Sequence, residues 1–184
     1  MALDRTWYNS LVNDDGSGLT GSVWDKEDVN QLMNAIDAEI ARISVPPYCF
    51  VYANGAQSFA HGAWDYVNFA AAFENGAGMW SSGAPNAITI PVAGHYYVNG
   101  CIYWAGNPTG ARMARILYNY QYNILADVRQ VPIGADNTTV YVSGIINAAA
   151  GAIITMQAYQ SSGAALGAGG TFPGTNYLQI YRAF

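Results

Sequence analysis

The sequence carries little charge, and most of it lies near the N-terminus. Only 10% of the 184 residues are Asp, Glu, Lys or Arg, against about 25% in an ordinary soluble domain. Residues 1–44 hold eight acids and three bases, whereas residues 45–184 hold four of each. A basic patch for phosphate groups is missing, so we expect no nucleic-acid partner. So neutral a surface must be covered in an assembly or solvated by uncharged polar side chains.

Long apolar runs and clusters of metal ligands are also missing. No run approaches the roughly 20 apolar residues of a membrane span, and the first residues, MALDRTWYNS, lack the regions of a signal peptide. We therefore expect that the protein is made in a cytoplasm and is not inserted into a membrane. The two histidines and two cysteines have no zinc-site spacing, so we expect neither metal nor another cofactor. Cys49 and Cys101 lie in strand-like runs, which favours buried free thiols over a disulfide.

Residues 1–24 combine apolar anchors with a glycine-rich centre and have neither helical nor strand periodicity. A segment of this kind cannot build its own core, and it usually becomes ordered on a partner that buries its large side chains. We interpret it as an extended docking segment. Its anchors are Trp7, Tyr8, Leu11, Val12, Leu19 and Trp24.

Residues 25–47 predict a short helix that begins at Asp25 and ends before Pro46 and Pro47. Its apolar stripe has the 4-3-4-3 spacing of a coiled-coil seam, and isoleucine at the seam favours three or four strands over two. We expect a trimer, with an amphipathic helix folded onto its own domain as the alternative. The stripe consists of Val29, Met33, Ile36, Ile40 and Ile43.

From residue 48 onward the apolar period is about 2, and turns are rich in Gly, Asn and Pro, which predicts an antiparallel sandwich over 48–184. The Gly- and Ala-rich stretch 161–171 is expected to be a long exposed loop. The predicted strands are 48–53, 64–70, 86–91, 94–104, 112–118, 122–128, 138–146, 152–160 and 176–182.

Tyrosine recurs on the outward face of these strands. In 176–182, for example, Leu178 and Ile180 alternate with tyrosines, and in 94–104 the inward side chains are Tyr96, Val98 and Ile102. Outward tyrosines can bury their rings between subunits while the hydroxyl groups find polar partners. We therefore predict an aromatic subunit interface made of Tyr97, Tyr103, Tyr141, Tyr159, Tyr177 and Tyr181.

The run ITIPVAGHYYVNGCIYW (88–104), with Pro91, Ala93 and Gly94 before the pair Tyr96 and Tyr97, resembles the C1q-like and tumour-necrosis-factor-like jelly roll. The final residues TFPGTNYLQIYRAF (171–184) resemble its last strand. The resemblance covers about 140 residues and implies a trimeric head packed around an aromatic three-fold axis. The acidic loops that bind calcium in some members are missing, and Ala152 stands where an acid often follows the penultimate-turn glycine.

The N-terminal part, TWYNSLVNDDGSGLTGSVWDKEDVNQLMNAID, is similar to the leading segment of bacteriophage fibre and head-appendage proteins. This resemblance implies a virion structural protein, assembled in the host cytoplasm, that docks on other virion proteins through residues 1–24. Residues 25–47 would form a short trimeric coil, and residues 48–184 a jelly-roll head that binds host surface glycan or protein. Recognition would fall to the exposed loops 105–111, 119–121, 132–137 and 161–171.

Three other functions remain open at this point. A capsid decoration or head-tail connector protein without receptor binding is the nearest alternative. A polysaccharide-degrading enzyme would need two facing carboxylates, and residues 48–184 offer only Asp65, Glu74, Asp127 and Asp136, so we expect no catalytic residues. A secreted signalling ligand would account for the sequon at Asn137 but not for residues 1–24.

Overall fold

The computed structural model of this chain describes residues 26–44, 46–120, 123–170 and 175–183. The chain divides into two units, Met1–Pro46 and Pro47–Phe184; we call the second the head unit. No helix in the described part is long and apolar enough to cross a membrane. The anchors predicted in 1–24 (Trp7, Tyr8, Leu11, Val12, Leu19 and Trp24) and the helix cap Asp25 lie outside the described residues.

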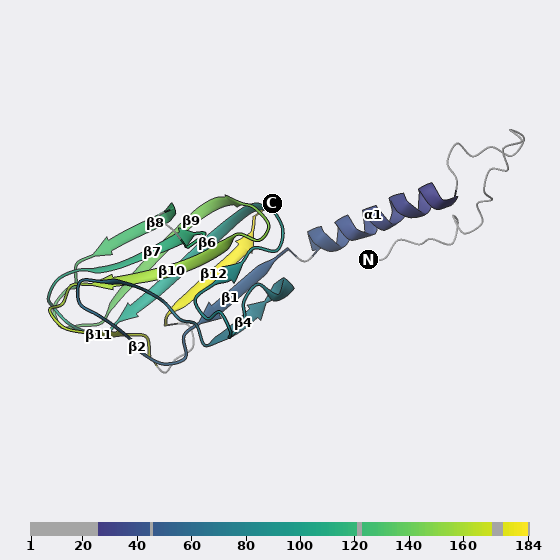
Figure 1. The fold of residues 1–184 in the computed structure, drawn as a ribbon. Coiled ribbons are helices and arrows are strands. Elements are labelled where there is room, and N and C mark those ends of the chain that lie inside the picture. The colour runs from purple at the N-terminus through teal and green to yellow at the C-terminus, as the bar shows by residue number, and fades with distance from the viewer. Residues whose placement is uncertain (1–25, 45, 121–122, 171–174, 184) are drawn as a thin grey trace, which may run out of the picture. The chain divides into compact units, whose positions relative to one another are not determined.

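The predicted helix is present as α1, Lys26–Ser44 (Figure 1). Along its apolar stripe Val29, Met33 and Ile40 are half-buried, whereas Ile36 is 37% exposed and the neighbouring Leu32 is 49% exposed. The side chain of Ile43 is outside the description. Exposed Leu and Ile side chains on one helix face suit packing against a further helix.

The head unit is an antiparallel sandwich of a seven-stranded and a five-stranded sheet, whose strands run along its length (Figure 1). In the seven-stranded sheet the order is β2-β11-β6-β12-β1-β4, and β9 pairs with the other edge of β6. Its strands are β1 (Tyr48–Tyr52), β2 (Gln57–Phe59), β4 (Ala71–Asn75), β6 (Gly94–Trp104), β9 (Thr138–Ala148), β11 (Leu166–Ala168) and β12 (Tyr177–Arg182).

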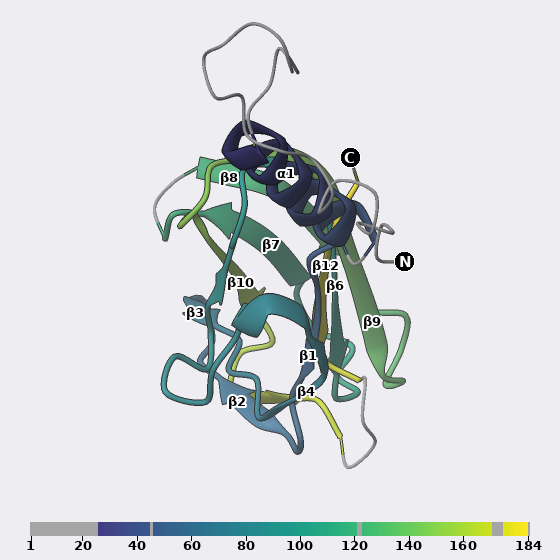
Figure 2. The same cartoon turned by 90° about the vertical axis from the view of Figure 1, so that its right-hand side faces the viewer.

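The five-stranded sheet has the order β3-β10-β7-β8, with β5 paired to the start of β10. Figure 2 shows β3, β10 and β7 on one side of the sandwich and β1, β12, β6 and β9 on the other. A short 3-10 helix, η2 (Gly76–Gly78), follows β4. The strands of this sheet are β3 (Trp64–Tyr66), β5 (Ile88–Thr89), β7 (Arg112–Tyr118), β8 (Asn123–Gln130) and β10 (Ile153–Gln160).

The core lies between the sheets and follows the predicted alternation. Tyr96, Val98 and Ile102 of β6 are fully buried, as are Leu178 and Ile180 of β12. Tyr96 donates a hydrogen bond from its hydroxyl to the carbonyl oxygen of Val92 at 2.7 Å, so its polar end is satisfied. The prediction of a mainly β antiparallel sandwich is therefore confirmed.

The main error of the strand prediction concerns small residues. The stretch 161–171 is not one long exposed loop, because residues 166–168 form β11, which pairs with β2 and buries Ala168 completely. Alanine and glycine have low strand propensity, and here the neighbouring strands decide the structure. The strand expected at 64–70 ends at Tyr66, and the one expected at 86–91 is limited to residues 88–89.

Both cysteines are free and buried, as predicted. Burial raises the pKa of Cys49 to about 12 and that of Cys101 to about 11, although for Cys101 a hydrogen bond with Tyr141 acts in the opposite direction. The thiolate is the reactive form of cysteine, so both side chains are protonated and inert in the folded head at neutral pH.

Thiol labelling tests this packing. With Ellman's reagent at pH 8, we expect no fast reaction of the folded protein and reaction of two thiols per chain in guanidinium chloride, because unfolding removes the burial that raises both pKa values. Fast labelling of either thiol under native conditions would contradict the structure.

Candidate interaction surfaces

The outer face of the seven-stranded sheet carries mostly aromatic side chains and no formal charge along its three central rows. Strand register aligns one row of Tyr48, Tyr181, Tyr97 and Ile145, because these residues pair in succession across β1, β12, β6 and β9. The next row consists of Phe50, Gln179, Asn99 and Ser143. The third consists of Tyr52, Tyr177, Cys101 and Tyr141.

The rings of this aromatic face contact one another within one subunit. Phe73 of β4 lies 4.6 Å from Tyr52 and 5.2 Å from Phe50, centroid to centroid, and Tyr97 lies 5.2 Å from Tyr181. Such separations are typical of favourable aromatic pairs. Much of the face nevertheless stays open, since Phe73 is 55% exposed and Tyr141 62% exposed.

Polar groups on the aromatic face are partly satisfied inside the subunit. Gln179 donates from its side-chain amide to the hydroxyl of Tyr48 at 3.1 Å, and Asn137 donates to the hydroxyl of Tyr103. Burial is the largest cause of the raised pKa of Tyr177, and Cys101 adds to it. The three rows across β1, β12, β6 and β9 are therefore neutral and suited to close packing. The nearest acid is Glu74 of β4, which pairs with Phe50 at their edge.

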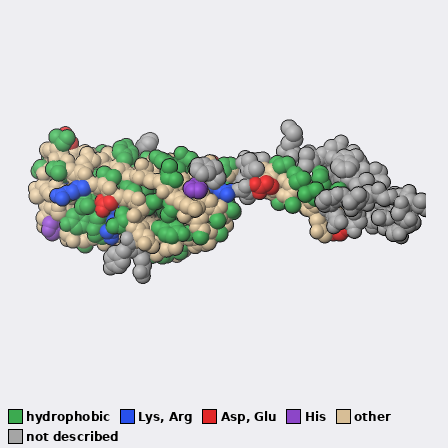
Figure 3. Space-filling model, turned by 90° about the horizontal axis from the view of Figure 1, so that it is seen from above, with side chains coloured by type: hydrophobic (Ala, Val, Ile, Leu, Met, Phe, Trp, Pro, Cys, Tyr) green, Lys and Arg blue, Asp and Glu red, His purple; other side chains and the backbone are tan. Residues whose placement is uncertain are grey.

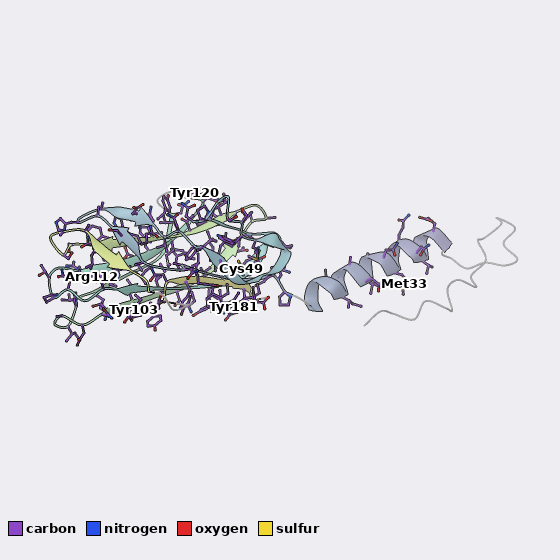
Figure 4. All side chains as sticks on the ribbon, turned by 90° about the horizontal axis from the view of Figure 1, so that it is seen from below. Met33, Cys49, Tyr103, Arg112, Tyr120 and Tyr181 are labelled. Atoms are coloured by element: carbon purple, nitrogen blue, oxygen red, sulfur yellow. The ribbon has the colours of Figure 1, made fainter. Side chains whose placement is uncertain are left out.

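Five of the six predicted interface tyrosines lie on this face: Tyr97 and Tyr103 on β6, Tyr141 on β9, and Tyr177 and Tyr181 on β12. The structure separates Tyr159 from them, because it belongs to β10 of the five-stranded sheet and packs against Trp64 at 5.3 Å. Figure 4 shows Tyr103 and Tyr181 on one side of the head unit and Tyr120 on the other. Alternation identifies outward residues but does not say to which sheet they belong.

Four aromatic residues of this face were missed by the sequence analysis. In YCFVY the outward side chains are Tyr48, Phe50 and Tyr52, while Cys49 and Val51 point into the core. Both faces of this strand are apolar, so the sequence does not contain the alternating polar residues that would identify its outward face. Phe73 was missed because β4 was not predicted.

A second candidate surface is the end of the head unit where β6 stops and β7 begins, which we call the loop end. Three of the predicted recognition loops meet there. The backbone of Ala111 accepts from the N–H of Ser161 at 3.1 Å and donates to the Ser161 hydroxyl at 2.9 Å. Gly106 approaches Ala135 so closely that a Cβ on Gly106 would overlap the Ala135 carbonyl. Loops 105–111 and 132–137 and the start of 161–171 therefore form one surface.

The side chain of Arg112 holds the backbone of loop 105–111 in place. This side chain, labelled in Figure 4, is fully buried. Nη1 donates to the carbonyl oxygens of Thr109 and Ala111, each at 3.0 Å, and Nη2 donates to that of Asn107 at 2.9 Å. Burial lowers the pKa of Arg112, but a guanidinium remains protonated at physiological pH. The cation is thus surrounded by carbonyl dipoles, which fix the loop backbone.

Gln160 does the same for the loop that follows β10. Its amide donates to the carbonyl oxygens of Phe59 and Ala164, at 3.0 and 2.8 Å, and its Oε1 accepts from the backbone N–H of Ser162 at 2.7 Å. Above this scaffold the loop end exposes apolar side chains, including Ile133, which is 85% exposed. Of the fourth predicted loop, 119–121, only Asn119 and Tyr120 are described; they follow the end of β7 that lies opposite the loop end.

The described residues contain no cluster of metal ligands, and the acids of the head unit lie on separate strands and loops. No group of three or more His, Cys, Asp or Glu side chains in this part of the chain is placed to hold a metal ion. The four acids of the head unit lie on separate elements: Asp65 on β3, Glu74 on β4, Asp127 on β8 and Asp136 in the loop before β9. Figure 3 shows how few charged side chains one face of the head unit carries.

Solved structures share this fold at low sequence identity. The globular domain of zebrafish complement 1qA is 12% identical, with a TM-score of 0.51, over 75% of this chain and 98% of that chain. Murine APRIL (pH 8.0) is 14% identical, with a TM-score of 0.57 over 75% and 99%. Eiger TNF from S. frugiperda is 11% identical, with a TM-score of 0.57 over 76% and 94%. The head unit therefore has the C1q/TNF-like jelly-roll fold. No family model and no curated protein matches the sequence.

The contact at Gly106 gives a test of the loop end. Gly106→Ala should lower the free energy of unfolding by about 1–3 kcal/mol, because the new Cβ forces the two loop backbones apart. The matched control is Gly83→Ala, whose Cβ would meet only the Ser81 hydroxyl at 3.9 Å; its effect should stay within about 0.5 kcal/mol. Urea denaturation of both variants measures the difference, and equal midpoints would contradict the packing described here.

Proposed function

We propose that this chain is the subunit of a homotrimeric structural protein, with the aromatic face of the seven-stranded sheet turned toward the three-fold axis. The observation that carries the proposal is the uncharged ring surface of three aligned rows, on which Tyr141 and Ile145 are 62% and 65% exposed. An exposed apolar surface of this kind marks an interaction site. The C1q/TNF-like fold and the isoleucine seam of α1 support three copies over two.

In such a trimer the five-stranded sheet faces outward, because it lies on the other side of the sandwich. The loop end, rigidified by Arg112 and Gln160, is then displayed in three copies. Three copies of a weak contact give avidity when their spacing allows simultaneous binding. We therefore assign the outer surface of the head to recognition of a host surface.

We further propose that the trimer is a virion fibre or spike, docked on other virion proteins by residues 1–24 and located in the virion. The support is the order of segments, an aromatic anchor, a short coil and a neutral head, and the resemblance of the N-terminal part to fibre proteins. A capsid decoration or connector protein would share the trimer and the anchor but would bind no host surface. The position of the four acids on separate elements, Asp65, Glu74, Asp127 and Asp136, supports a role without catalysis.

The trimer interface is tested by placing charge on the aromatic face. The double variant Tyr141→Asp/Ile145→Asp should sediment as a monomer, because burying two unpaired carboxylates in an apolar interface costs several kcal/mol. Ile133→Asp is the control, since Ile133 is 85% exposed but lies in the loop before β9; it should remain trimeric. A trimeric double variant with native circular dichroism would refute this interface.

The docking role of residues 1–24 predicts that Trp7→Ala/Trp24→Ala abolishes incorporation into particles while leaving the trimer intact, because the two rings are its largest anchors. Quantitative immunoblotting of purified particles measures incorporation, and sedimentation of the free protein is the control. Normal incorporation of the double variant would remove this part of the proposal.

A further inference from the structure

The outer face of the five-stranded sheet carries a second aromatic cluster, separate from the proposed trimer interface. Register places Trp64 beside Tyr159 and Tyr66 beside Gln157 across β3 and β10. Gln157 in turn pairs with Arg115 of β7. Opposed residues of an antiparallel pair point to the same side of a sheet. These side chains therefore form one flat patch, which we call the Trp64 patch.

Contacts inside the Trp64 patch hold the Arg115 side chain in place. The Arg115 guanidinium lies over the Trp64 ring, with Cζ 4.0 Å from the ring centroid, within the range of a cation–π contact. Arg115 donates from Nε and Nη2 to Oε1 of Gln157, at 2.8 and 2.6 Å. Among the described residues, Arg115 Nη1 and Gln157 Nε2 have no hydrogen-bond partner, so both remain available as donors.

Tyr120 extends the patch and is held in an unfavourable backbone conformation. Its φ of 59° follows a φ of 54° at Asn119, and the left-handed region is costly for a bulky aromatic residue. Tyr66 of β3 holds this turn in place. Its hydroxyl donates to the carbonyl oxygen of Tyr120 at 3.2 Å, and the Tyr120 ring lies 6.3 Å from that of Tyr66. The ring is 41% exposed. The strained backbone at Tyr120 is therefore not compensated by burial of its ring in the core. Uncompensated backbone strain is typical of functional positions.

We propose that the Trp64 patch binds a neutral pyranose glycan; the inference rests on the proposed role in host-surface binding and deepens it. A pyranose ring has an apolar C–H face, which suits the Tyr66 and Tyr120 rings, and hydroxyl groups on its edge, which suit the two available donors. Tyrosine offers this contact area with little loss of side-chain entropy. The glycan thus lies across Tyr66 and Tyr120, with its hydroxyl groups directed toward Arg115 Nη1 and Gln157 Nε2. The Trp64 ring lies under the guanidinium and holds Arg115 in place.

The charges around Arg115 favour a neutral sugar over an acidic one. Gln157 engages Nε and one N–H of Nη2, and the remaining N–H groups of Arg115 can donate to sugar hydroxyl groups. Asp127 lies across the strand pair from Arg115. Its carboxylate offsets the charge of the guanidinium and would repel an anionic sugar.

The test is binding of the full-length protein to an immobilised array of neutral and acidic oligosaccharides, with affinities for the neutral hits measured by titration calorimetry. We expect neutral glycans to bind, Trp64→Ala to weaken them at least tenfold, and Tyr120→Gly to weaken them by a similar factor. Glycine accepts the left-handed conformation, so Tyr120→Gly should melt no lower than the parent protein. This variant therefore separates loss of binding from loss of folding. Gly83→Ala, whose Cβ would meet only the Ser81 hydroxyl at 3.9 Å, belongs to neither proposed surface; it is the control and should bind normally.

The remaining outcomes each decide the inference. Lack of binding to all neutral glycans, preference for acidic glycans, or unchanged affinity in both patch variants would overturn it. Binding of a host protein that survives removal of its glycans, and that is lost in Trp64→Ala, would also overturn it in favour of a protein partner. Sedimentation of the same samples distinguishes the two proposals. A trimer that binds no glycan refutes only the glycan site, whereas a monomer refutes the proposed trimer.

Discussion

The structure depends on a sheet that is apolar on both faces. In β1 the inward residues Cys49 and Val51 are fully buried in the core, while Tyr48, Phe50 and Tyr52 point the other way. One apolar face builds the sandwich, and the second is left at the surface of the single chain. Hydrophobic burial scales with the apolar area removed from water, so the second face favours association for the same reason that the first favours folding. Fold and proposed assembly thus use the same physical interaction on opposite sides of one sheet.

The long strands could be predicted because their polar and apolar residues alternate over enough positions to exclude other structures. This holds for β6 and β12, where Val98, Ile102, Leu178 and Ile180 are all fully buried as expected. The short strands β2, β4 and β11 lack such a pattern, and only their neighbours in the sheet define them. Tyr159 shows a further limit, since alternation says that a residue points outward but cannot assign it to one of two sheets.

The candidate surfaces were predictable to different degrees. Five aromatic-face tyrosines follow from alternation, but the meeting of three loops around Arg112 follows from topology, which brings segments 50 residues apart into hydrogen-bond contact, as between Ala111 and Ser161. A buried arginine without a carboxylate partner has no sequence pattern of its own. The Trp64 patch is likewise built from three strands, and its strained turn at Tyr120 becomes visible only in the backbone angles.

The position of β1 in its sheet also determines how the head carries mechanical load. The chain leaves Pro47 directly into β1, which is hydrogen-bonded on one side to β12 and on the other to β4. A pulling force applied through the preceding segment acts along the strand, and the ladder bonds are perpendicular to it. To extract β1, such a force must shear both ladders together rather than open one bond at a time. The head is therefore tethered through a strand in which tension is shared by many bonds at once.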